Sequence, residues 1–462
     1  MVEQAKSEMI YGLETKPGPL PALFTAIQHV LASLVGVVTP PLIIGSVLGL
    51  NAYLPYLISM SLLVSGIGTF IQSRRFYGVG AGMLCLQGTS FAFLSVTLAA
   101  GFAIKSRGGS AEDILSMIFG INFIAAFVPI ILSRFIGKLR RIITPLITGI
   151  VITLIGISLI KVSIVDWGGG HNAPDFGAPI NLLLGGVTLL VILVLSRINH
   201  NWIRLSAVVF GIIAGCLLAY FSGTWQLHPS TDSAWIELPK VFHFGFSFDW
   251  ALFVPIALIS AISIIEAVGD ITANCMLSQV PIDGESYIKR LEGGVLADGV
   301  SCAMAAILGA FPTTTFAQNN GVIQMTGVAS RHVGLYIGAI LILLGVFPFL
   351  SHILQQLPTP VLGGATLLMF GSVAAAGIRI ISHTSLTRRD MLIIAVSFGI
   401  GLGIEAEPDF LQHLPKVIQN MFGSAITSGG VIAIILNLFL PNDRPVSVTQ
   451  THTAIPHMES EM

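Results

Sequence analysis

The stretch FAQNNGVIQMTGVASR, residues 316–331, places three consecutive amide side chains between long apolar segments. Within a hydrocarbon layer, Gln318, Asn319 and Asn320 would be costly unless they paired with other protein groups or lined a cavity. Residues 313–316 favour extended backbone, and the residues from Gly321 onward are able to form a short helix. The pattern therefore predicts a strand, a polar turn and a half-helix around a functional site. The alternative is an extramembrane loop rich in Asn and Gly.

The composition indicates an integral membrane protein. Of the 462 residues, 54% are hydrophobic and 10% are charged, whereas soluble domains carry roughly 25% charged residues. Apolar segments of about 20 residues recur along the chain, as in helical membrane proteins and unlike the ten-residue alternation of outer-membrane barrels. The net charge of -1 gives no indication of nucleic-acid binding. The four cysteines lack CxxC spacing, so neither a metal site nor a disulfide framework is indicated.

Fourteen membrane spans are predicted from the apolar segments. Residues 1–21 lack the order of basic and then apolar residues that marks a cleaved signal peptide, so the first span is expected to remain. The predicted spans are residues 23–48, 54–72, 80–101, 114–133, 142–161, 180–196, 205–222, 250–277, 292–311, 313–330, 332–350, 359–381, 390–404 and 421–440.

The basic residues predict how these spans are oriented. With a cytoplasmic N-terminus, 17 of the 22 Lys and Arg residues lie on the cytoplasmic side and 5 lie outside, as the positive-inside rule requires. Both termini are therefore expected in the cytoplasm. The pairs 140–141 and 388–389, all Arg, are expected to anchor this topology. The outside residues are Lys105, Arg107, Lys161, Lys240 and Lys416.

Two pairs of similar segments, one member in each half, suggest that the second half of the chain repeats the first. LCLQGTSF at residues 84–91 is similar to TTFAQNNG at residues 314–321, with an extended run followed by Gln87 or Gln318. Because seven spans per half is an odd number, the second copy must be inverted in the membrane. In the other pair, PLITGIVITLIG is similar to PVLGGATLLMFG. Pro145, Gly149 and Gly156 in the first segment have the same spacing as Pro360, Gly364 and Gly371 in the second.

Inverted repeats of this kind bring the paired interrupted helices face to face near the middle of the membrane. The N-termini of the half-helices offer backbone N–H groups and the positive end of a helix dipole. Non-helical backbone is tolerated at that depth only where it lines a cavity or is buried in protein. The sequence therefore predicts a central substrate site between residues 87–91 and 318–321.

The predicted span at residues 250–277 adds acidic groups in IIEAVGDITANC. Glu266, Asp270 and Asn274 follow one another at intervals of four, so they share one helical face. A carboxylate at the bilayer centre costs roughly 2.5–3.5 kcal/mol on insertion scales. Two on one face also repel, so at least one is expected to be paired or protonated. Alternatively, this is the cytoplasmic end of the span and the acids are solvated.

Three other residues are candidates for function. Asp298, in GGVLADGVSCAM, lies six residues into the next apolar segment, where it is a proton carrier or a helix cap near the membrane surface. His29, beside Gln28 in the first span, is a hydrogen-bonded structural residue or a substrate ligand. Phe91 follows the first interrupted segment, where its ring stacks on a flat ligand or only packs.

These groups together suit a planar heteroaromatic ligand with alternating N–H and C=O groups. A carboxylate accepts from ring N–H, a Gln amide donates and accepts, backbone N–H groups bind carbonyl oxygens, and an aromatic ring stacks. The sequence contains no phosphate-binding loop, Ser/His/Asp ordering or zinc spacing. Transport is therefore favoured over catalysis.

The segment QNNGVIQMTGVASR, with EAVGDIT upstream and GGVLADG between them, resembles the nucleobase–ascorbate transporter family, the nucleobase:cation symporters, and within it the bacterial xanthine permeases. The resemblance covers about residues 13–441. It implies an all-α membrane protein of fourteen spans in two inverted repeats of seven, with short strands in spans 3 and 10. It also implies a core domain of spans 1–4 and 8–11 that moves like an elevator against a gate domain of spans 5–7 and 12–14, in a homodimer.

On this basis, the core domain is expected at residues 23–140 and 250–352, and the gate domain at residues 141–225 and 353–440. The other parts are a cytoplasmic N-terminal segment at residues 1–22, an extracytoplasmic linker at residues 226–249 and a cytoplasmic tail at residues 441–462.

The resemblance also implies which residues bind the substrate. Glu266 matches the substrate-binding carboxylate, Gln318 the amide that pairs with the base, and Asn319 a neighbouring determinant of affinity. Ser90 stands where one group of xanthine permeases has Asn, which leaves the choice between xanthine and uric acid open. The predicted substrate site is completed by Phe91 at the stacking position, with Ser90 and Gly88.

A partly overlapping set is implied for proton coupling. Asp298 matches the essential acid of span 9, and Asp270 matches the second acid of span 8. His29 matches the first-span histidine, and Glu266 belongs to both sets. The proton is the coupling ion, and no cofactor or metal is expected.

The predicted function is proton-coupled import of xanthine, or of uric acid or a related oxopurine, across the inner membrane of a bacterium. The expected partners are the purine base, protons, the lipid bilayer and a second copy of the chain, without nucleic acid. One alternative is a carrier of another nucleobase, such as uracil or guanine. The others are a small-anion transporter of the same architecture, and a membrane-embedded enzyme or receptor.

Overall fold

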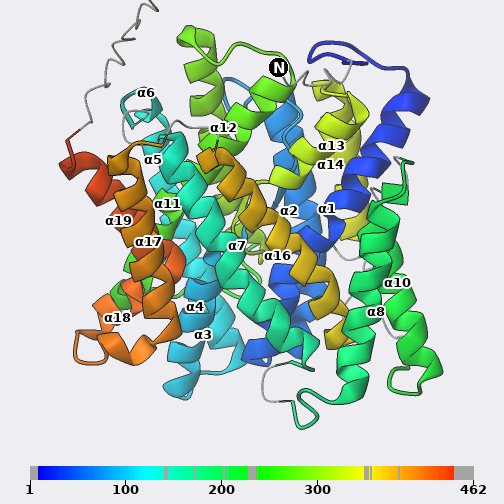
Figure 1. Cartoon of the computed structure of the whole chain (residues 1–462), viewed down its shortest axis with the longest axis vertical. Helices are drawn as coiled ribbons and strands as arrows, with labels where there is room; N and C mark the ends of the chain where they lie inside the picture. The colour runs from blue at the N-terminus through cyan, green and yellow to red at the C-terminus, as the bar shows by residue number, and fades with distance from the viewer. Residues whose placement is uncertain are drawn as a thin grey trace, which may run out of the picture.

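The computed structural model describes residues 9–139, 144–170, 173–200, 203–204, 206–226, 236, 238–347, 353, 356–382 and 386–441. Within these ranges the chain is a bundle of helices with one pair of short strands, which confirms the predicted all-α class (Figure 1). The strands are β1 (Gln87–Thr89) and β2 (Thr313–Thr315). The helices are α1 (Pro19–Leu48), η1 (Asn51–Tyr53), α2 (Leu54–Arg74), η2 (Phe91–Phe93), α3 (Leu94–Ser106), α4 (Ala111–Ala125), α5 (Phe127–Ser133), α6 (Ile136–Leu139), α7 (Pro145–Trp167), α8 (Pro179–Ser196), α10 (Ala207–Phe221), α11 (Trp250–Leu277), α12 (Gly284–Leu308), α13 (Ala317–Thr326), α14 (Arg331–Val346), α16 (Thr359–Ser382), α17 (Arg388–Ala406), η3 (Pro408–Leu411), α18 (Lys416–Phe422) and α19 (Ala425–Phe439).

Among the described residues, eight helical stretches are long and apolar enough to cross a membrane. Every predicted span overlaps a helix. The two interrupted segments do not form continuous helices over their predicted spans, because each is divided between a strand and a half-helix. The total of fourteen spans therefore stays a prediction. The eight stretches are α1, α7, α8, α11, α12 and α16, with the joined stretches Asn51–Arg74 and Ala111–Ser133.

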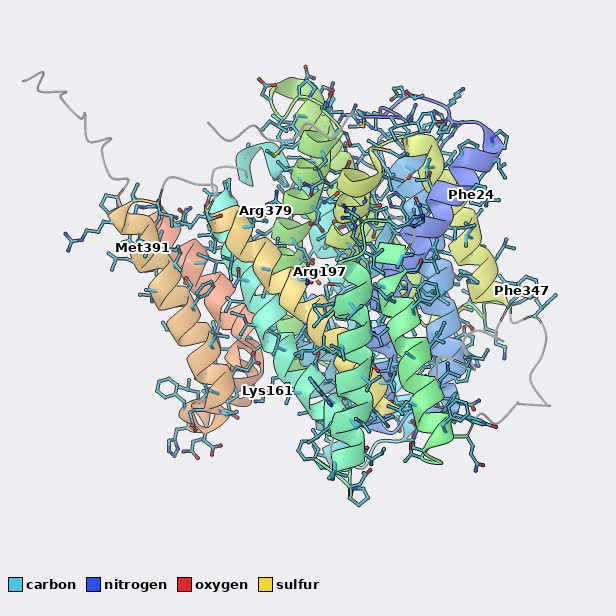
Figure 2. All side chains as sticks on the ribbon, turned by 45° about the vertical axis from the view of Figure 1, so that its right-hand side comes forward. Phe24, Lys161, Arg197, Phe347, Arg379 and Met391 are labelled. Carbon is cyan, nitrogen blue, oxygen red and sulfur yellow. The ribbon has the colours of Figure 1, made fainter. Side chains whose placement is uncertain are left out.

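The outer surface of the bundle is apolar, as a protein surrounded by lipid requires. Phe24, Phe347 and Met391 are 48%, 47% and 54% exposed and point away from the helices (Figure 2). Arg379 and Lys161, expected on opposite sides of the membrane, lie nearer opposite ends of the bundle (Figure 2). Which end is cytoplasmic stays a prediction. Of the expected anchor pairs, Arg140 and Arg141 lie outside the described residues.

Contacts between helices divide the bundle into two groups. Group A contains α1 to α5 and α11 to α14, and group B contains α7, α8, α10, α16, α17 and α19. Figure 1 shows α7 and α16 of group B side by side, with α17 and α19 on one flank and α8 and α10 on the other. Helix α11 of group A also contacts α7 and α19 of group B. The assignment of a core domain and a gate domain, and their relative motion, stay predictions.

Glycine allows α7 and α16 to touch through their backbones. A Cβ at Gly149 would lie 2.9 Å from the Gly377 carbonyl oxygen, and one at Gly156 would lie 2.3 Å from the nitrogen of Ala374. Such small residues at a helix crossing permit close packing within a membrane. At Gly371, which corresponds to Gly156 in the sequence repeat, a Cβ would meet no described atom within 4 Å. Gly156 and Gly371 therefore match in spacing but not in packing, and the inverted repeat stays a prediction.

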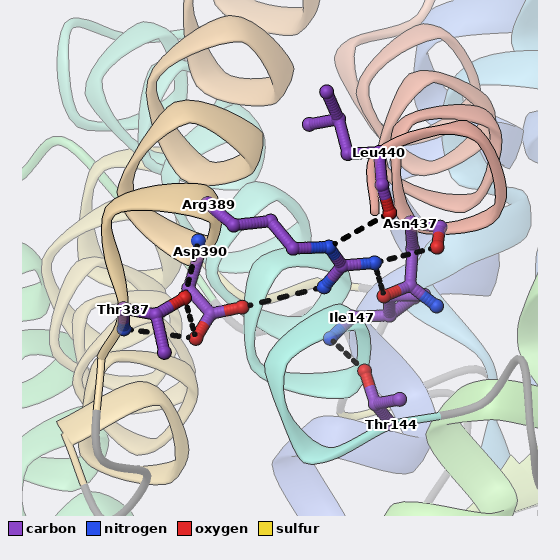
Figure 3. A network of polar contacts seen from close by, with 7 residues as sticks. All are labelled: Thr144, Ile147, Thr387, Arg389, Asp390, Asn437 and Leu440. Carbon is purple, nitrogen blue, oxygen red and sulfur yellow. Dashed lines mark hydrogen bonds and ion pairs between the residues drawn. The ribbon is translucent and has the colours of Figure 1, made fainter. Parts of the chain in front are cut away.

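Arg389, at the start of α17, closes the C-terminal end of α19 (Figure 3). Its guanidinium donates from Nε to the carbonyl oxygen of Leu440 at 3.1 Å and from Nη2 to that of Asn437 at 2.6 Å. A cation at this end of a helix also interacts favourably with the helix dipole. Thr387 and Asp390 form a capping box at the start of α17 (Figure 3). These contacts fix one end of group B.

The N-terminal segment is bound to the end of the half-helix α13. The backbone N–H of Tyr11 donates to the carbonyl oxygen of Gly327 at 3.2 Å, and the N–H of Ala329 donates to that of Tyr11 at 2.8 Å. Glu14 and Arg331 form an ion pair at 2.8 Å. The segment expected only as a cytoplasmic extension therefore supports α13, and α1 begins at Pro19 instead of residue 23.

Asp249 connects the start of α11 to the end of α3 and predicts a pH dependence of stability. Its carboxylate accepts from the Ala251 N–H at 2.8 Å and from Nη1 of Arg107 at 2.7 Å. The hydrogen bond from Arg107, which outweighs the opposing effect of desolvation, holds the pKa of Asp249 below its ordinary value. Its contribution to folding is therefore complete above about pH 4, the unfolded pKa, and is lost as the pH falls through the lower folded pKa.

Replacement Asp249→Asn removes this charged interaction but keeps an oxygen for the helix cap. We expect it to lower the free energy of unfolding at pH 7 by about 1 kcal/mol or less, because the Arg107 side chain is 55% exposed to solvent. Apparent unfolding temperatures of the purified protein at pH 3 to 7 test this, with wild type losing more stability than the variant in the acid range. Parallel curves would exclude a contribution from this pair.

Candidate functional site

The two interrupted segments meet as predicted. Strands β1 and β2 pair antiparallel, with Gln87 opposite Thr315 and Thr89 opposite Thr313. The ladder is extended by the N–H of Ser90, which donates to the carbonyl oxygen of Pro312 at 2.8 Å. All residues of both strands are buried. Each strand therefore satisfies the backbone groups of the other where neither segment is helical.

A helix begins directly after each strand. Neither Ser90, before η2, nor Phe316, before α13, makes a side-chain capping hydrogen bond. The first N–H groups of a helix lack partners within the helix, so uncapped N-termini attract hydrogen-bond acceptors such as carbonyl oxygens. The paired strands thus place two half-helix N-termini on neighbouring segments.

Asp298 of α12 is bonded to both α2 and the strands. Its Oδ1 accepts from Nε2 of Gln72 at 2.8 Å and from Nε2 of Gln87 at 2.6 Å, and its Oδ2 accepts from Oγ1 of Thr314 at 3.1 Å. Gln72 also donates to the Gly294 carbonyl oxygen at 2.9 Å. The carboxylate is 6% exposed, which excludes the alternative of a surface helix cap. Sequence reasoning did not identify Gln72.

The acids of α11 lie beside the same strands. Helix α11 contacts β2, η2 and α13. Oδ2 of Asp270 accepts from Oγ1 of Thr315 at 3.4 Å, and the Asp270 carbonyl oxygen accepts from Nδ2 of Asn320 at 3.1 Å. One turn earlier, Oε2 of Glu266 is buried without a hydrogen-bond partner among the described residues. Glu266 is therefore the acid with free capacity to accept a ligand N–H.

These carboxylates are not neutralised by basic side chains. Over the described ranges, no ion pair includes Glu266, Asp270 or Asp298. Nor does any group of three His, Cys, Asp or Glu residues in that part of the chain have the arrangement needed to hold a metal ion. The site is an acidic region surrounded by amides, hydroxyls and apolar side chains.

Two amides have positioning contacts that their spacing did not predict. Nδ2 of Asn319 donates to the Leu84 carbonyl oxygen at 2.6 Å, and Nδ2 of Asn274 donates to the same oxygen at 2.7 Å. They tie α13 and α11 to the residues before β1. Gln318, in the first turn of α13, is half-buried. His29 is fully buried, and neither ring nitrogen has a hydrogen-bond partner among the described residues.

Phe91 lies in a group of three aromatic rings. Its ring stacks on Phe316 with centroids 6.4 Å apart and meets the edge of Phe370 at 4.9 Å. Phe370 belongs to α16, so the aromatic group joins group A to group B. Ser90 is 2% exposed, and its hydroxyl has no partner among the described residues. Phe91 and Ser90 therefore lie at the boundary of the two groups.

The ring of Phe316 packs so closely on Gly88 that it leaves no room for a side chain at this position. A Cβ at Gly88 would lie 2.3 Å from Cζ of Phe316, so Gly88→Ala would require this ring or its backbone to shift. Overpacking of this kind typically costs about 1–3 kcal/mol. We expect a lower apparent unfolding temperature and loss of most transport. Gly371→Ala is the matched control, because its Cβ would meet nothing described within 4 Å. Equal behaviour of the two variants would contradict the contact.

Comparison with known proteins identifies relatives over nearly the whole chain. The family described as "Permease family", Xan_ur_permease, matches residues 21–410. Xanthine permease XanP of Escherichia coli (strain K12) is 44% identical over 451 residues, which cover 96% of this chain and 97% of the relative. Xanthine permease XanQ of the same strain is 44% identical over 444 residues, which cover 95% of each chain.

A solved structure is similar in fold. The transmembrane domain of the cyanobacterial bicarbonate transporter BicA superposes with a TM-score of 0.58 at 14% sequence identity. The match covers 92% of this chain and 99% of that domain. At this identity the likeness concerns the fold alone.

Proposed function

The chain belongs to the nucleobase–ascorbate transporter family, the Xan_ur_permease family of permeases, and from this premise we propose that it imports xanthine or a closely related oxopurine. It is a transporter and not an enzyme. The substrate proposal is supported by XanP and XanQ, whose names specify xanthine and whose identity of 44% extends over 95–96% of this chain.

The observation that carries the proposal is the buried Oε2 of Glu266, which has no described partner and lies on a helix packed against β2, η2 and α13. In the proposed complex, Glu266 accepts from a ring N–H of the base. Gln318 donates to and accepts from the base edge, and Phe91 stacks on its plane. Asn319, Gly88 and Ser90 shape the space around these contacts.

Proton coupling is proposed to centre on Asp298. Its hydrogen bonds to Gln72 and Gln87 connect it to α2 and to the strand that precedes η2. A change in its charge therefore acts on the same segment that carries Phe91. Glu266, Asp270 and His29 complete the proposed coupling set. Base and proton are proposed to bind together, because a carrier that moved either alone would leak.

The proposed transport motion is a displacement of group A as the core against group B as the gate. The site is carried by group A, while Phe370 of group B contacts Phe91. The likeness in fold to a bicarbonate transporter raises the alternative of a small-anion carrier. Three carboxylates without basic partners would repel an anion, which favours a neutral base. The proposed assembly is a homodimer of fourteen-span chains in a bacterial inner membrane, with both termini in the cytoplasm.

Uptake of radiolabelled xanthine by cells lacking their own purine permeases tests the proposed function. Competition with uric acid, hypoxanthine, guanine and uracil defines the base, and bicarbonate or sulfate tests the anion alternative. Uptake should rise as the external pH is lowered and should fall with a protonophore. Transport indifferent to both treatments would exclude proton symport, and no uptake of any base would exclude a nucleobase carrier.

A further inference from the structure

A small cavity borders Asp298 between α4, α11 and α12. About 10 Å³ is open to the centres of water molecules, which is roughly the space that one water needs. Apolar side chains make up most of the wall, including those of Phe93, Ile264 and Val295. The polar lining comes from Asn122, Ser260, Ser263, Asp298 and Thr313. A cavity of this size is expected to hold a water when two to four polar groups face it.

Asn122 of α4 contributes an unpaired amide to this cavity. The residue is 2% exposed, and neither Nδ2 nor Oδ1 has a hydrogen-bond partner among the described residues. Oγ1 of Thr313, in β2, is likewise without a described partner. A buried amide with no partner is strongly unfavourable, so two such groups lining one cavity indicate a polar ligand.

The hydrogen bonds of Asp298 indicate what that ligand does. Gln72 and Gln87 both present amide N–H groups to the carboxylate, and these nitrogens donate but do not accept. The Thr314 hydroxyl, at 3.1 Å from Oδ2, is a third donor, and the backbone N–H of Thr315 also donates to the carboxylate. Once Asp298 carries a proton, its O–H needs an acceptor. If the Thr314 hydroxyl turned to accept, its own hydrogen would need one instead.

We propose that the cavity binds one water molecule, held by Asn122 and Thr313, which supplies the acceptor that protonated Asp298 requires. Asn122 is then a positioning residue for the coupling proton, because it acts on Asp298 through the water. The inference rests on the proposed function, in which Asp298 carries that proton. Among the described residues, the other ionisable groups near Asp298 are Glu266 and Asp270 of α11, Cys85 before β1, and Cys302 of α12, which also lines the cavity.

Two assays in proteoliposomes separate this role from a structural one. Uptake of xanthine driven by a pH gradient requires Asp298 to gain and lose its proton, whereas exchange of internal for external xanthine requires only movement of the loaded carrier. Asn122→Leu keeps a similar volume and removes the polar atoms. We expect it to lower gradient-driven uptake roughly tenfold, to shift the pH at which uptake is half-maximal, and to change exchange by less than about twofold.

Two further variants complete the experiment. Asn122→Ser keeps a polar group and leaves more room for water, so it should restore at least about half of the gradient-driven uptake. Ile121→Leu, at a fully buried neighbour on α4, is the control for repacking. Unchanged gradient-driven uptake in Asn122→Leu, or loss of both activities in both Asn122 variants, would overturn the inference. Absence of xanthine transport in the wild-type protein would instead reject the proposed function.

Discussion

Replacement of Glu266 with Gln is expected to lower the initial rate of xanthine uptake about 100-fold while the protein still folds. The carboxylate oxygen Oε2 is buried without a described partner, so it is available to accept a ring N–H of the base. A hydrogen bond to a charged group contributes about 1.5–3 kcal/mol. Gln at this position would also direct an N–H group toward a donor. The measurement is radiolabelled xanthine uptake in cells without other purine permeases, normalised to the amount of carrier in the membrane.

Glu285→Gln is the matched control for this substitution. It removes the same charge from an exposed pair with Lys289, at 2.6 Å, that lies outside the site. Exposed pairs of this kind contribute little, so uptake should remain normal. The companion variant Gln318→Ala should lower uptake at least about tenfold, since it removes an amide that both donates and accepts. Full uptake by Glu266→Gln or by Gln318→Ala would refute the assigned site.

The two breaks were predictable because their signals are local, and their meeting was predicted from the inverted-repeat hypothesis. An amide cluster inside an apolar segment, preceded by residues that favour extended backbone, marks a break in a helix, and Gln87 marked the second break in the same way. The backbone N–H and C=O groups of each strand need hydrogen-bond partners, and the strand at the other break provides them. The register, with Gln87 opposite Thr315, is a long-range property that no single segment contains.

Gln72 was missed for the same reason. It was the last residue of the predicted span 54–72, where a polar side chain before two arginines is typical of a membrane surface. Its function depends on the packing of α2 against α12, which brings Nε2 within 2.8 Å of Asp298. The contacts of Asn274 and Asn319 were missed for the same reason. Both amides donate to the carbonyl oxygen of Leu84, which depends on how α11 and α13 pack beside the residues before β1.

The replacement of Asp298 with Asn is expected to separate transport from proton coupling. The Asn oxygen is able to accept from Gln72 and Gln87, and its amide is able to donate to the Thr314 hydroxyl, so these three side-chain contacts have replacements. The change in apparent unfolding temperature should therefore be small, below about 3 °C. Asn does not ionise, however, and resembles only the protonated state of Asp298. Gradient-driven uptake of xanthine should fall at least about 100-fold, whereas exchange should continue.

Asp298→Leu provides the contrasting result, because it removes every acceptor at this position. The Nε2 groups of Gln72 and Gln87 would then be buried with fewer partners, at a cost of about 1–3 kcal/mol for each unsatisfied group. We expect a clear fall in apparent unfolding temperature and loss of both uptake and exchange. The comparison is decisive because neither replacement side chain carries a charge, so the two variants differ only in the hydrogen bonds that they retain. If Asp298→Asn lost stability and exchange as fully as Asp298→Leu, the carboxylate would serve the packing of α2, α12 and the strands, and the coupling proton would have to reside elsewhere.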